Sequence, residues 1–210
     1  MKRWMLGAIC ASTLTAANVP PPAVDLPAPA AGKVATAVLA GGQFWGVEAV
    51  LQKLKGVIAV VPGYAGGKAE DAQESMVVAR KTKHAESVQI TYDPSQISYG
   101  RLLQVFFAVV HDPTQIDRQG PDIGPQFRSV IFYSSDGQKQ VAQAYIKQIE
   151  KAHVFHDPIA TQVTLLPGFF PAEDHHRQYV RQNPNDPYVM QNISPKLQAL
   201  QQQFPDLLKP

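Results

Sequence analysis

The chain has 210 residues, of which 45% are hydrophobic and 17% are charged. This length suits a single domain, and this composition can bury a core and excludes a disordered polyelectrolyte. The formal net charge is +2, which equals the charge of Lys2 and Arg3 alone, so the rest of the chain is neutral. A neutral chain gives no reason to expect a nucleic acid or an anionic membrane as the partner.

The first residues predict export. Lys2 and Arg3 precede a mostly apolar run that is too short to cross a bilayer, and small residues follow up to Ala17. We therefore expect residues 1–17 to be a cleaved signal peptide and the mature protein to be periplasmic. The alternative is a disordered apolar tail. A lipid anchor on Cys10 is disfavoured, because Ile9 stands where a lipoprotein signal requires a small residue.

Cys10 is the only cysteine of the sequence and lies inside the predicted signal peptide. The mature chain would therefore contain no disulfide, no thiolate metal site and no thiol nucleophile. Two pairs of histidines, His153 with His156 and His175 with His176, have no third ligand beside them in the sequence. We therefore expect structural or surface histidines and no metal.

Proline and alanine dominate residues 18–32, which predicts an extended linker before a single globular domain at 33–210 with a polar C-terminal tail. Hydrophobic periodicity predicts strands at 33–40, 57–61, 86–92, 128–133 and 160–166. It predicts helices at 44–54, 99–110 and 137–152, and Pro62–Gly67 reads as a turn. Strands that alternate with helices favour an α/β or α+β sandwich with a mixed sheet.

A glycine pair, Gly41 and Gly42, joins the first predicted strand to the first predicted helix. Free N–H groups at such a helix start can stabilise an anion, so an enzyme could place a nucleophile there. Gln43 occupies the position, and a carboxamide is not a nucleophile. Phe44 and Trp45 follow, and on pattern alone they pack the end of the helix.

Two carboxylates are candidates for chemistry. Glu86 shares a strand face with Val88 and Ile90, so burial would raise its pKa and suit it to general-acid work. The alternative is that Glu86 lies at the frayed start of the strand and reaches solvent. Asp122 lies in a loop between a helix and a strand, where it could simply bond turn amides.

The chain resembles the peptide-methionine (S)-S-oxide reductases, the A-type methionine sulfoxide reductases, from about Val34 to about Pro184. Five segments carry the resemblance in the family's order: GGQFWGVEAV, GYAGG, KHAESVQITYDP, HDPTQIDRQGPDIGPQFRSVIFY and FFPAEDHHRQYVRQNP. The resemblance implies a ferredoxin-like α/β sandwich that reduces methionine-S-sulfoxide in proteins or peptides. In that family a cysteine attacks the sulfoxide sulfur and becomes a sulfenic acid. Thioredoxin or another thiol then restores it, and no cofactor is implied.

The resemblance also implies roles for particular residues. Phe44 and Trp45 match the aromatic pair that holds the methyl group of the substrate. Tyr64 matches a tyrosine that bonds the sulfoxide oxygen, and Glu86 matches the acid that protonates this oxygen. Asp122 matches an aspartate that helps to hold the pocket together.

Four positions depart from the family's pattern. Gln43 stands where the family has its nucleophilic cysteine, and Phe127 stands where it has a second tyrosine. Lys83 replaces a glycine, and His175 replaces an aromatic residue. Loss of the nucleophile of a covalent mechanism costs several orders of magnitude in rate.

We therefore expect a catalytically impaired member that still binds sulfoxide, and its status as an enzyme stays open. One alternative is an active exported reductase that repairs oxidised methionine with a different nucleophile and a thioredoxin-like reductant. The other is a structural or partner-binding relic.

Overall fold

The computed structural model describes residues 17–27 and 32–210. The predicted signal peptide up to residue 16, with Cys10, and residues 28–31 of the predicted linker lie outside these ranges. Within them, no helix combines the length and the hydrophobicity needed to cross a membrane.

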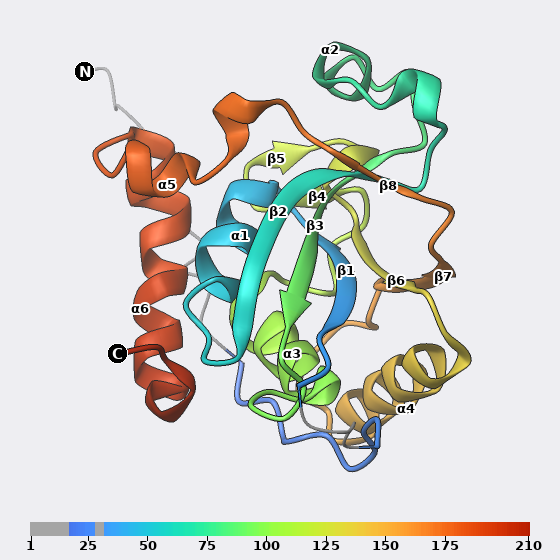
Figure 1. Ribbon diagram of the computed structural model, residues 1–210, viewed down its shortest axis with the longest axis vertical. Helices are drawn as coiled ribbons and strands as arrows, with labels where there is room; N and C mark the ends of the chain where they lie inside the picture. The colour runs from blue at the N-terminus through green and yellow to red at the C-terminus, as the bar shows by residue number, and fades with distance from the viewer. Residues whose placement is uncertain (1–16, 28–31) are drawn as a thin grey trace, which may run out of the picture.

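Six strands form one sheet in the order β7–β6–β1–β3–β2–β8 (Figure 1). Their bounds are Ala35–Gly41 for β1, Val57–Ala65 for β2, Ala85–Tyr92 for β3, Ser129–Tyr133 for β6, Gln162–Leu165 for β7 and Phe169–Pro171 for β8. Only the β6–β7 pair of this sheet is parallel, so the sheet is mixed. The short strands β4 (Arg118–Gln119) and β5 (Asp122–Ile123) pair separately.

The helices that connect the central strands give the fold its class. Helix α1 (Phe44–Leu51) joins β1 to β2, and α3 (Tyr99–Val105), prolonged by a π-helical turn at Phe106–Val110, lies between β3 and β6. The order β1–α1–β2–β3–α3–β6, with the strands arranged β6–β1–β3–β2, is the ferredoxin-like arrangement. The remaining helices are α2 (Glu74–Val78), α4 (Asp136–Lys151), α5 (Tyr179–Gln182) and α6 (Ser194–Gln203). The predicted α/β class with a mixed sheet is confirmed.

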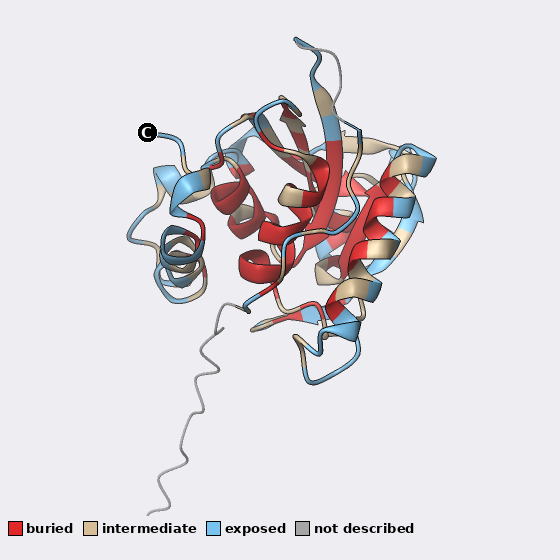
Figure 2. Ribbon diagram, turned by 90° about the horizontal axis from the view of Figure 1, so that it is seen from below, coloured by how far each residue is buried: buried red, intermediate tan, exposed pale blue. Residues whose placement is uncertain are grey.

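The main core lies between the sheet and the helices α1, α3 and α4, and Figure 2 shows the buried residues gathered in the centre of the domain. Leu39, Val88 and Ile90 face this core from β1 and β3. A smaller cluster that includes Ala65 and Ala85 covers the opposite face of the sheet. Side chains alternate along a strand, so Glu86 faces the same side as Val88 and Ile90, toward α1.

The predicted turn at Pro62–Gly67 is wrong, because β2 continues to Ala65. Residues 63–65 pair with β3 on one side and with β8 on the other. Pro62 has no N–H to donate, but its carbonyl accepts a hydrogen bond from Ala172 N at 2.9 Å. A Cβ on Gly63 would lie 2.4 Å from the carbonyl oxygen of Phe170, so only glycine lets β8 approach this closely.

The first helix is shorter than predicted. It ends at Leu51, whereas the hydrophobic spacing extends to Leu54. The reason lies at the far end of the chain, where Leu54 bridges to Leu208 and Lys55 N donates to the carbonyl of Leu207 at 2.7 Å. Pairing with the C-terminal residues draws this segment out of the helix.

Residues 17–27 of the Pro/Ala-rich segment belong to no helix or strand and lie against the domain rather than away from it. Val19 is buried, and its carbonyl accepts from Gln104 Nε2 at 2.8 Å. The hydroxyl of Tyr145 donates to the carbonyl of Pro20 at 2.6 Å. Contacts with the domain therefore begin before residue 33.

Asp25 fastens this segment to α3. Its carboxylate accepts from Gly100 N at 2.8 Å and from the hydroxyl of Ser98, the residue that caps the helix.

Replacing Asp25 with Ala should lower the free energy of unfolding by about 1–2 kcal/mol, as loss of a helix cap does. Urea denaturation of the full chain measures this. Asp157→Ala, at an exposed carboxylate that faces its neighbour His156, is the control, and an equal effect of both changes would contradict the prediction.

Candidate active site

The candidate site begins where β1 passes into α1. Gly42 has a φ of +92°, and a Cβ on it would lie 2.6 Å from the side chain of Gln119, so this position needs glycine. The next residue, Gln43, caps the helix: its side-chain oxygen Oε1 accepts from Trp45 N at 2.7 Å. Gln43 therefore occupies the helix start as a neutral acceptor.

The other amides of the first helical turn also have acceptors within the protein. Phe44 N donates to Glu86 Oε2 at 3.2 Å, and Gly46 N donates to the carbonyl of Gln43 at 3.2 Å. The sequence-based expectation of free N–H groups at this helix start is thus wrong. The cause is local, because Gln43 and Glu86 both lie close enough to accept from them.

Glu86 is buried and only 6% exposed, so the alternative of a solvent-facing carboxylate is excluded. Burial raises its pKa from 4.5 to about 8. The hydrogen bond from Phe44 opposes this rise, and the negative charges of Asp122 and Glu74 add to it. The predicted rise in pKa is confirmed, and at neutral pH Glu86 carries a proton that it can donate.

Tyr64 lies directly opposite Glu86 in the β2–β3 pair. Its hydroxyl donates to Glu173 Oε2 at 2.9 Å, and its ring centre lies 6.0 Å from that of Phe44. Burial raises the pKa of Tyr64, and the hydrogen bond and charge of Glu173 raise it further. The phenol therefore stays protonated beside the protonated carboxyl of Glu86.

Trp45 is surrounded by aromatic rings from the C-terminal part of the chain. It stacks on Tyr179 with ring centres 3.7 Å apart, and it meets the edge of Tyr188 at 6.1 Å. Its indole Nε1–H donates to His176 Nδ1 at 3.2 Å. From the sequence, no role was predicted for Tyr179 or Tyr188, and His176 was predicted to be a structural or surface histidine; Tyr179 and His176 lie within the FFPAEDHHRQYVRQNP segment.

Asp122 faces the same group of rings. Its carboxylate accepts from the hydroxyl of Tyr188 at 2.5 Å, so it reaches a residue 66 positions away. Burial raises the pKa of Asp122, whereas the hydrogen bond from Tyr188 and the positive charge of Lys196 lower it. Lys196 lies against the first turn of α1, where a Cβ on Gly46 would be 3.6 Å from its Nζ. Burial lowers the pKa of Lys196 to about 8, against the opposing effect of Asp122.

A second buried carboxylate, Glu48 on α1, holds the C-terminal segment in place. Both of its oxygens accept from Gln178 N at 3.1 Å. Gln178 has the left-handed φ of 53° and immediately precedes α5, which carries Tyr179. Burial raises the pKa of Glu48 to about 7, although the bond from Gln178 opposes the rise. Glu48 thus positions the ring that stacks on Trp45.

Phe127 ends the turn η3 (Pro125–Phe127), which packs against β3. Its phenyl ring has no hydroxyl to offer to a substrate oxygen. Gln43, Phe44, Trp45, Tyr64, Glu86 and Asp122 meet around the start of α1 through the contacts given above, and Tyr188 supplies a phenol that sequence reasoning missed.

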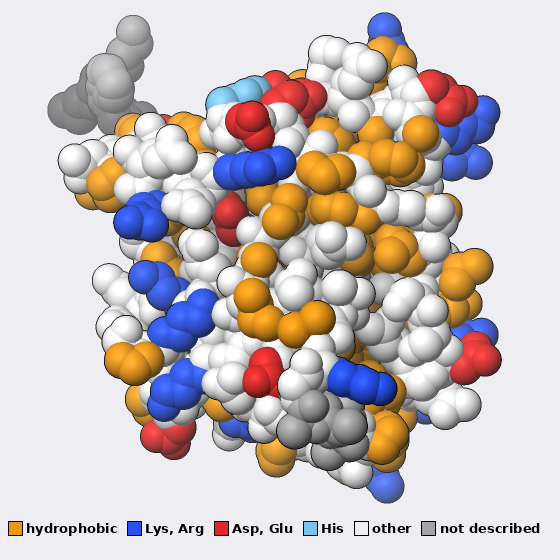
Figure 3. Space-filling model, in the orientation of Figure 1, with side chains coloured by type: hydrophobic (Ala, Val, Ile, Leu, Met, Phe, Trp, Pro, Cys, Tyr) orange, Lys and Arg blue, Asp and Glu red, His pale blue; other side chains and the backbone are white. Residues whose placement is uncertain are grey.

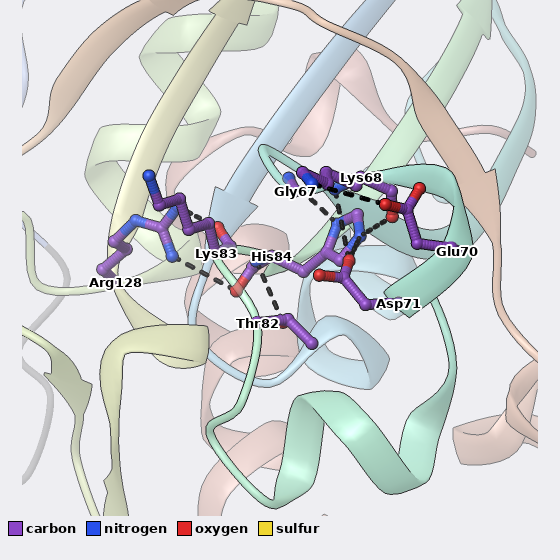
Figure 4. Close-up of polar contacts among 8 residues, drawn as sticks. All are labelled: Gly67, Lys68, Glu70, Asp71, Thr82, Lys83, His84 and Arg128. Carbon is purple, nitrogen blue, oxygen red and sulfur yellow. Dashed lines mark hydrogen bonds and ion pairs between the residues drawn. The ribbon is translucent and has the colours of Figure 1, made fainter.

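His84 lies two residues before Glu86 in the chain, and Figure 4 shows the polar contacts that hold it. Its buried ring accepts from Gly67 N at 3.2 Å through Nδ1, and its Nε2 faces the carbonyl of Lys68 at 2.9 Å and Asp71 at 3.0 Å. Arg128 donates to the carbonyls of Lys83 and His84. Lys83 thus contributes its backbone carbonyl to this network. Its φ is not positive, so this position does not require a glycine.

Comparison with known proteins identifies the family of the chain. A family model described as Peptide methionine sulfoxide reductase matches residues 35–208. The chain is 51% identical over 172 residues to Peptide methionine sulfoxide reductase MsrA 2 of Mesorhizobium japonicum, covering 82% of this chain and 88% of that protein. It is 48% identical over 193 residues to the MsrA 2 of Synechocystis sp., covering 91% and 90%.

Two solved structures share the fold. Reduced Mxr1 of Saccharomyces cerevisiae aligns with a TM-score of 0.67 and 31% identity, covering 74% of this chain and 88% of that one. Methionine sulfoxide reductase A of Corynebacterium diphtheriae aligns with a TM-score of 0.62 and 30% identity, covering 80% and 83%.

The raised pKa of Glu86 predicts how stability depends on pH. Between pH 4.5 and about 8 the folded chain keeps a proton that the unfolded chain releases, so stability falls as pH rises. Glu86 alone contributes a slope of up to about 1.4 kcal/mol per pH unit in this range. Urea denaturation should show that Glu86→Gln removes this part of the slope, whereas Glu150→Gln, at an exposed site, should retain it. Parallel slopes for Glu86→Gln and the unmodified chain would mean that Glu86 is ionised when folded.

Proposed function

The chain belongs to the A-type peptide methionine sulfoxide reductase family, and we propose that this member binds methionine-S-sulfoxide at the start of α1 without reducing it. Reduction of methionine sulfoxide is the activity of that family. The binding proposal rests on the groups that surround the helix start, and the loss of reduction rests on the residue at the helix cap.

The single observation that carries the proposal is the position of Gln43. The side chain that would be the nucleophile in the family is here a carboxamide whose oxygen accepts from Trp45 N. Its nitrogen lone pair is delocalised into the carbonyl, so it cannot attack sulfur. Cys10 is the only cysteine of the sequence and belongs to the predicted signal peptide.

The rest of the pocket suits a methyl sulfoxide. Phe44 and Trp45 offer apolar rings to the methyl group, and Tyr179 stacks on Trp45 and supports it. The sulfoxide oxygen, a strong acceptor, would face the protonated carboxyl of Glu86, and Tyr64 would bond it by turning its O–H away from Glu173. A pocket with a proton donor and an aromatic wall can bind this group with no nucleophile present.

In the family reaction the cysteine attacks the sulfoxide sulfur, and the substrate oxygen then passes to the cysteine sulfur as the substrate S–O bond breaks, which gives a sulfenic acid and methionine. Glu86 would supply the proton that the oxygen needs. Without the nucleophile, the reaction stops before its first step, the attack on the sulfoxide sulfur. A thioredoxin-like reductant is therefore proposed only for the alternative in which the chain is active.

Whether the chain is active or only binds sulfoxide, we propose export to the periplasm, on the basis of residues 1–17.

Restoring the thiol tests the proposal. In excess dithiothreitol, which removes the need for a second cysteine, Gln43→Cys should reduce a peptide methionine-S-sulfoxide at least a thousandfold faster than the unmodified chain. Methionine formation is followed by chromatography. Both chains carry Cys10→Ser, so that residue 43 is the only site that can hold a thiol. The variant Gln43→Ser, with a poorer nucleophile of similar size to cysteine, is the matched control.

Turnover by the unmodified chain at the rate of Gln43→Cys would contradict the proposal and would require a different nucleophile. Inactivity of both chains, with Gln43→Cys folded, would instead favour the alternative of a relic.

A further inference from the structure

A second group of ionisable side chains lies beside Trp45, outside the pocket proposed above. Glu74 begins α2, and His175 and His176 belong to the turn η4 (Asp174–His176) between β8 and α5. His175 Nε2 lies 3.3 Å from Glu74 Oε2, and His176 Nε2 lies 3.3 Å from Glu74 Oε1. Figure 3 shows histidine and acidic side chains side by side on the surface over the segment between β8 and α5.

His176 Nε2 is a buried polar atom that lacks a hydrogen bond, and it is one of few such side-chain atoms in the part of the chain that the structure describes. The residue is only 5% exposed. Glu74 Oε1 is near enough to bond Nε2 but is not aligned with it. Leaving such an atom without a partner is unfavourable, because it loses its hydrogen bonds to water and gains none in the protein. This nitrogen lies beside the Glu74 carboxylate and near His175, where an ion held between the three side chains could take it as a ligand.

The donor atoms of the three residues lie within 4.8 Å of one another. Bond lengths of about 2.0–2.2 Å to zinc correspond to separations of about 3.3–3.6 Å between neighbouring ligand atoms of a tetrahedral site. The two nitrogen–oxygen distances of 3.3 Å have this length but end on the two different oxygens of Glu74, so the carboxylate turns to bring one oxygen between the histidines when an ion binds. The side chains of His175 and Glu74 are 61% and 43% exposed, so they can close on an ion and leave a position for water.

From this geometry we infer that Glu74, His175 and His176 form a site for a divalent cation that prefers nitrogen and oxygen ligands, with Zn²⁺ as its representative. Two histidines and one carboxylate, with an open fourth position, are a ligand set that zinc uses in proteins. Glu173 keeps Glu74 in place, because its Oε1 accepts from Glu74 N at 3.0 Å. The site does not depend on sulfoxide binding.

The site is coupled to Trp45 through the ring of His176. Trp45 Nε1–H donates to His176 Nδ1, so a neutral His176 carries its proton on Nε2. A metal bound at Nε2 moves this proton to Nδ1, where it opposes the indole N–H, because both are then donors. Metal binding therefore breaks the bond between Trp45 and His176, and the indole loses one of its supports.

From the sequence, His175 and His176 were predicted to bind no metal, because no third ligand is evident beside them. The missing ligand is Glu74, about a hundred positions earlier in the chain, and it is brought to the histidines by α2. The expectation that this pair lacks a third candidate ligand is therefore wrong.

Titration with Zn²⁺ tests the inference in the full chain with Trp4→Phe and Cys10→Ser, so that Trp45 is the only tryptophan and no thiol is present. Calorimetry should show one Zn²⁺ per chain. Zn²⁺ has no redox chemistry, so a change in Trp45 fluorescence with the same midpoint reports the broken hydrogen bond. Glu74→Gln and His175→Asn, both at partly exposed side chains, should each weaken binding at least tenfold.

His156→Asn is the matched control, because exposed His156 also pairs with a carboxylate, that of Asp157. It should leave the affinity unchanged. Absence of binding, or equal weakening by His156→Asn and His175→Asn, would overturn the site. Binding with constant fluorescence would overturn its coupling to Trp45. The assay contains no sulfoxide, so these outcomes are separate from those that test the proposed function.

Discussion

The amides at the start of α1 require acceptors, and the arrangement of the pocket follows from the side chains that supply them. The side chain of Gln43 accepts a hydrogen bond from Trp45 N, and the carboxyl of Glu86 accepts one from Phe44 N. The second of these bonds ties α1 to β3 and keeps Glu86 buried, and burial in turn keeps Glu86 protonated. One set of backbone donors thus fixes both the cap of the helix and the acid of the site.

The aromatic rings around Trp45 come from the C-terminal segment, which α1 holds through a few specific contacts. The carboxylate of Glu48 binds the backbone of Gln178, and Tyr179 then stacks on Trp45. Tyr188 reaches Asp122 from the same segment. These contacts join α1 and β5 to residues far along the chain, so the site exists only once the C-terminal part has docked.

Hydrophobic periodicity predicted the features of the fold that depend on local sequence. The alternation of Val88, Ile90 and Tyr92 predicted the strand β3 and, through side-chain parity, the burial of Glu86. It failed where pairing with distant segments decides the structure. The turn expected at Pro62 is strand because β8 pairs with it, and α1 ends before Leu54 because Leu208 bridges to that residue.

The family resemblance placed Phe44, Trp45 and Glu86 but not the residues that support them. Glu48 looked like an ordinary helix glutamate, because its partner is a backbone amide 130 positions away. Tyr188 and Lys196 follow no hydrophobic pattern that could connect them to Asp122. The contact of Glu74 with His175 and His176 could not be predicted for the same reason, because these residues lie far apart in the sequence. Local sequence therefore predicted the fold and the first turn of α1, whereas the pocket wall required three-dimensional contacts.

The central claim is that the pocket still recognises a methyl sulfoxide although Gln43 replaces the nucleophile. Titration of the full chain carrying Trp4→Phe with N-acetylmethionine-S-sulfoxide tests this most directly, with the fluorescence of Trp45 as the signal. The account predicts saturable binding of the S epimer and at least tenfold weaker binding of the R epimer, which has the same composition but opposite geometry at sulfur. A flat titration, or equal affinity for the two epimers, would contradict it.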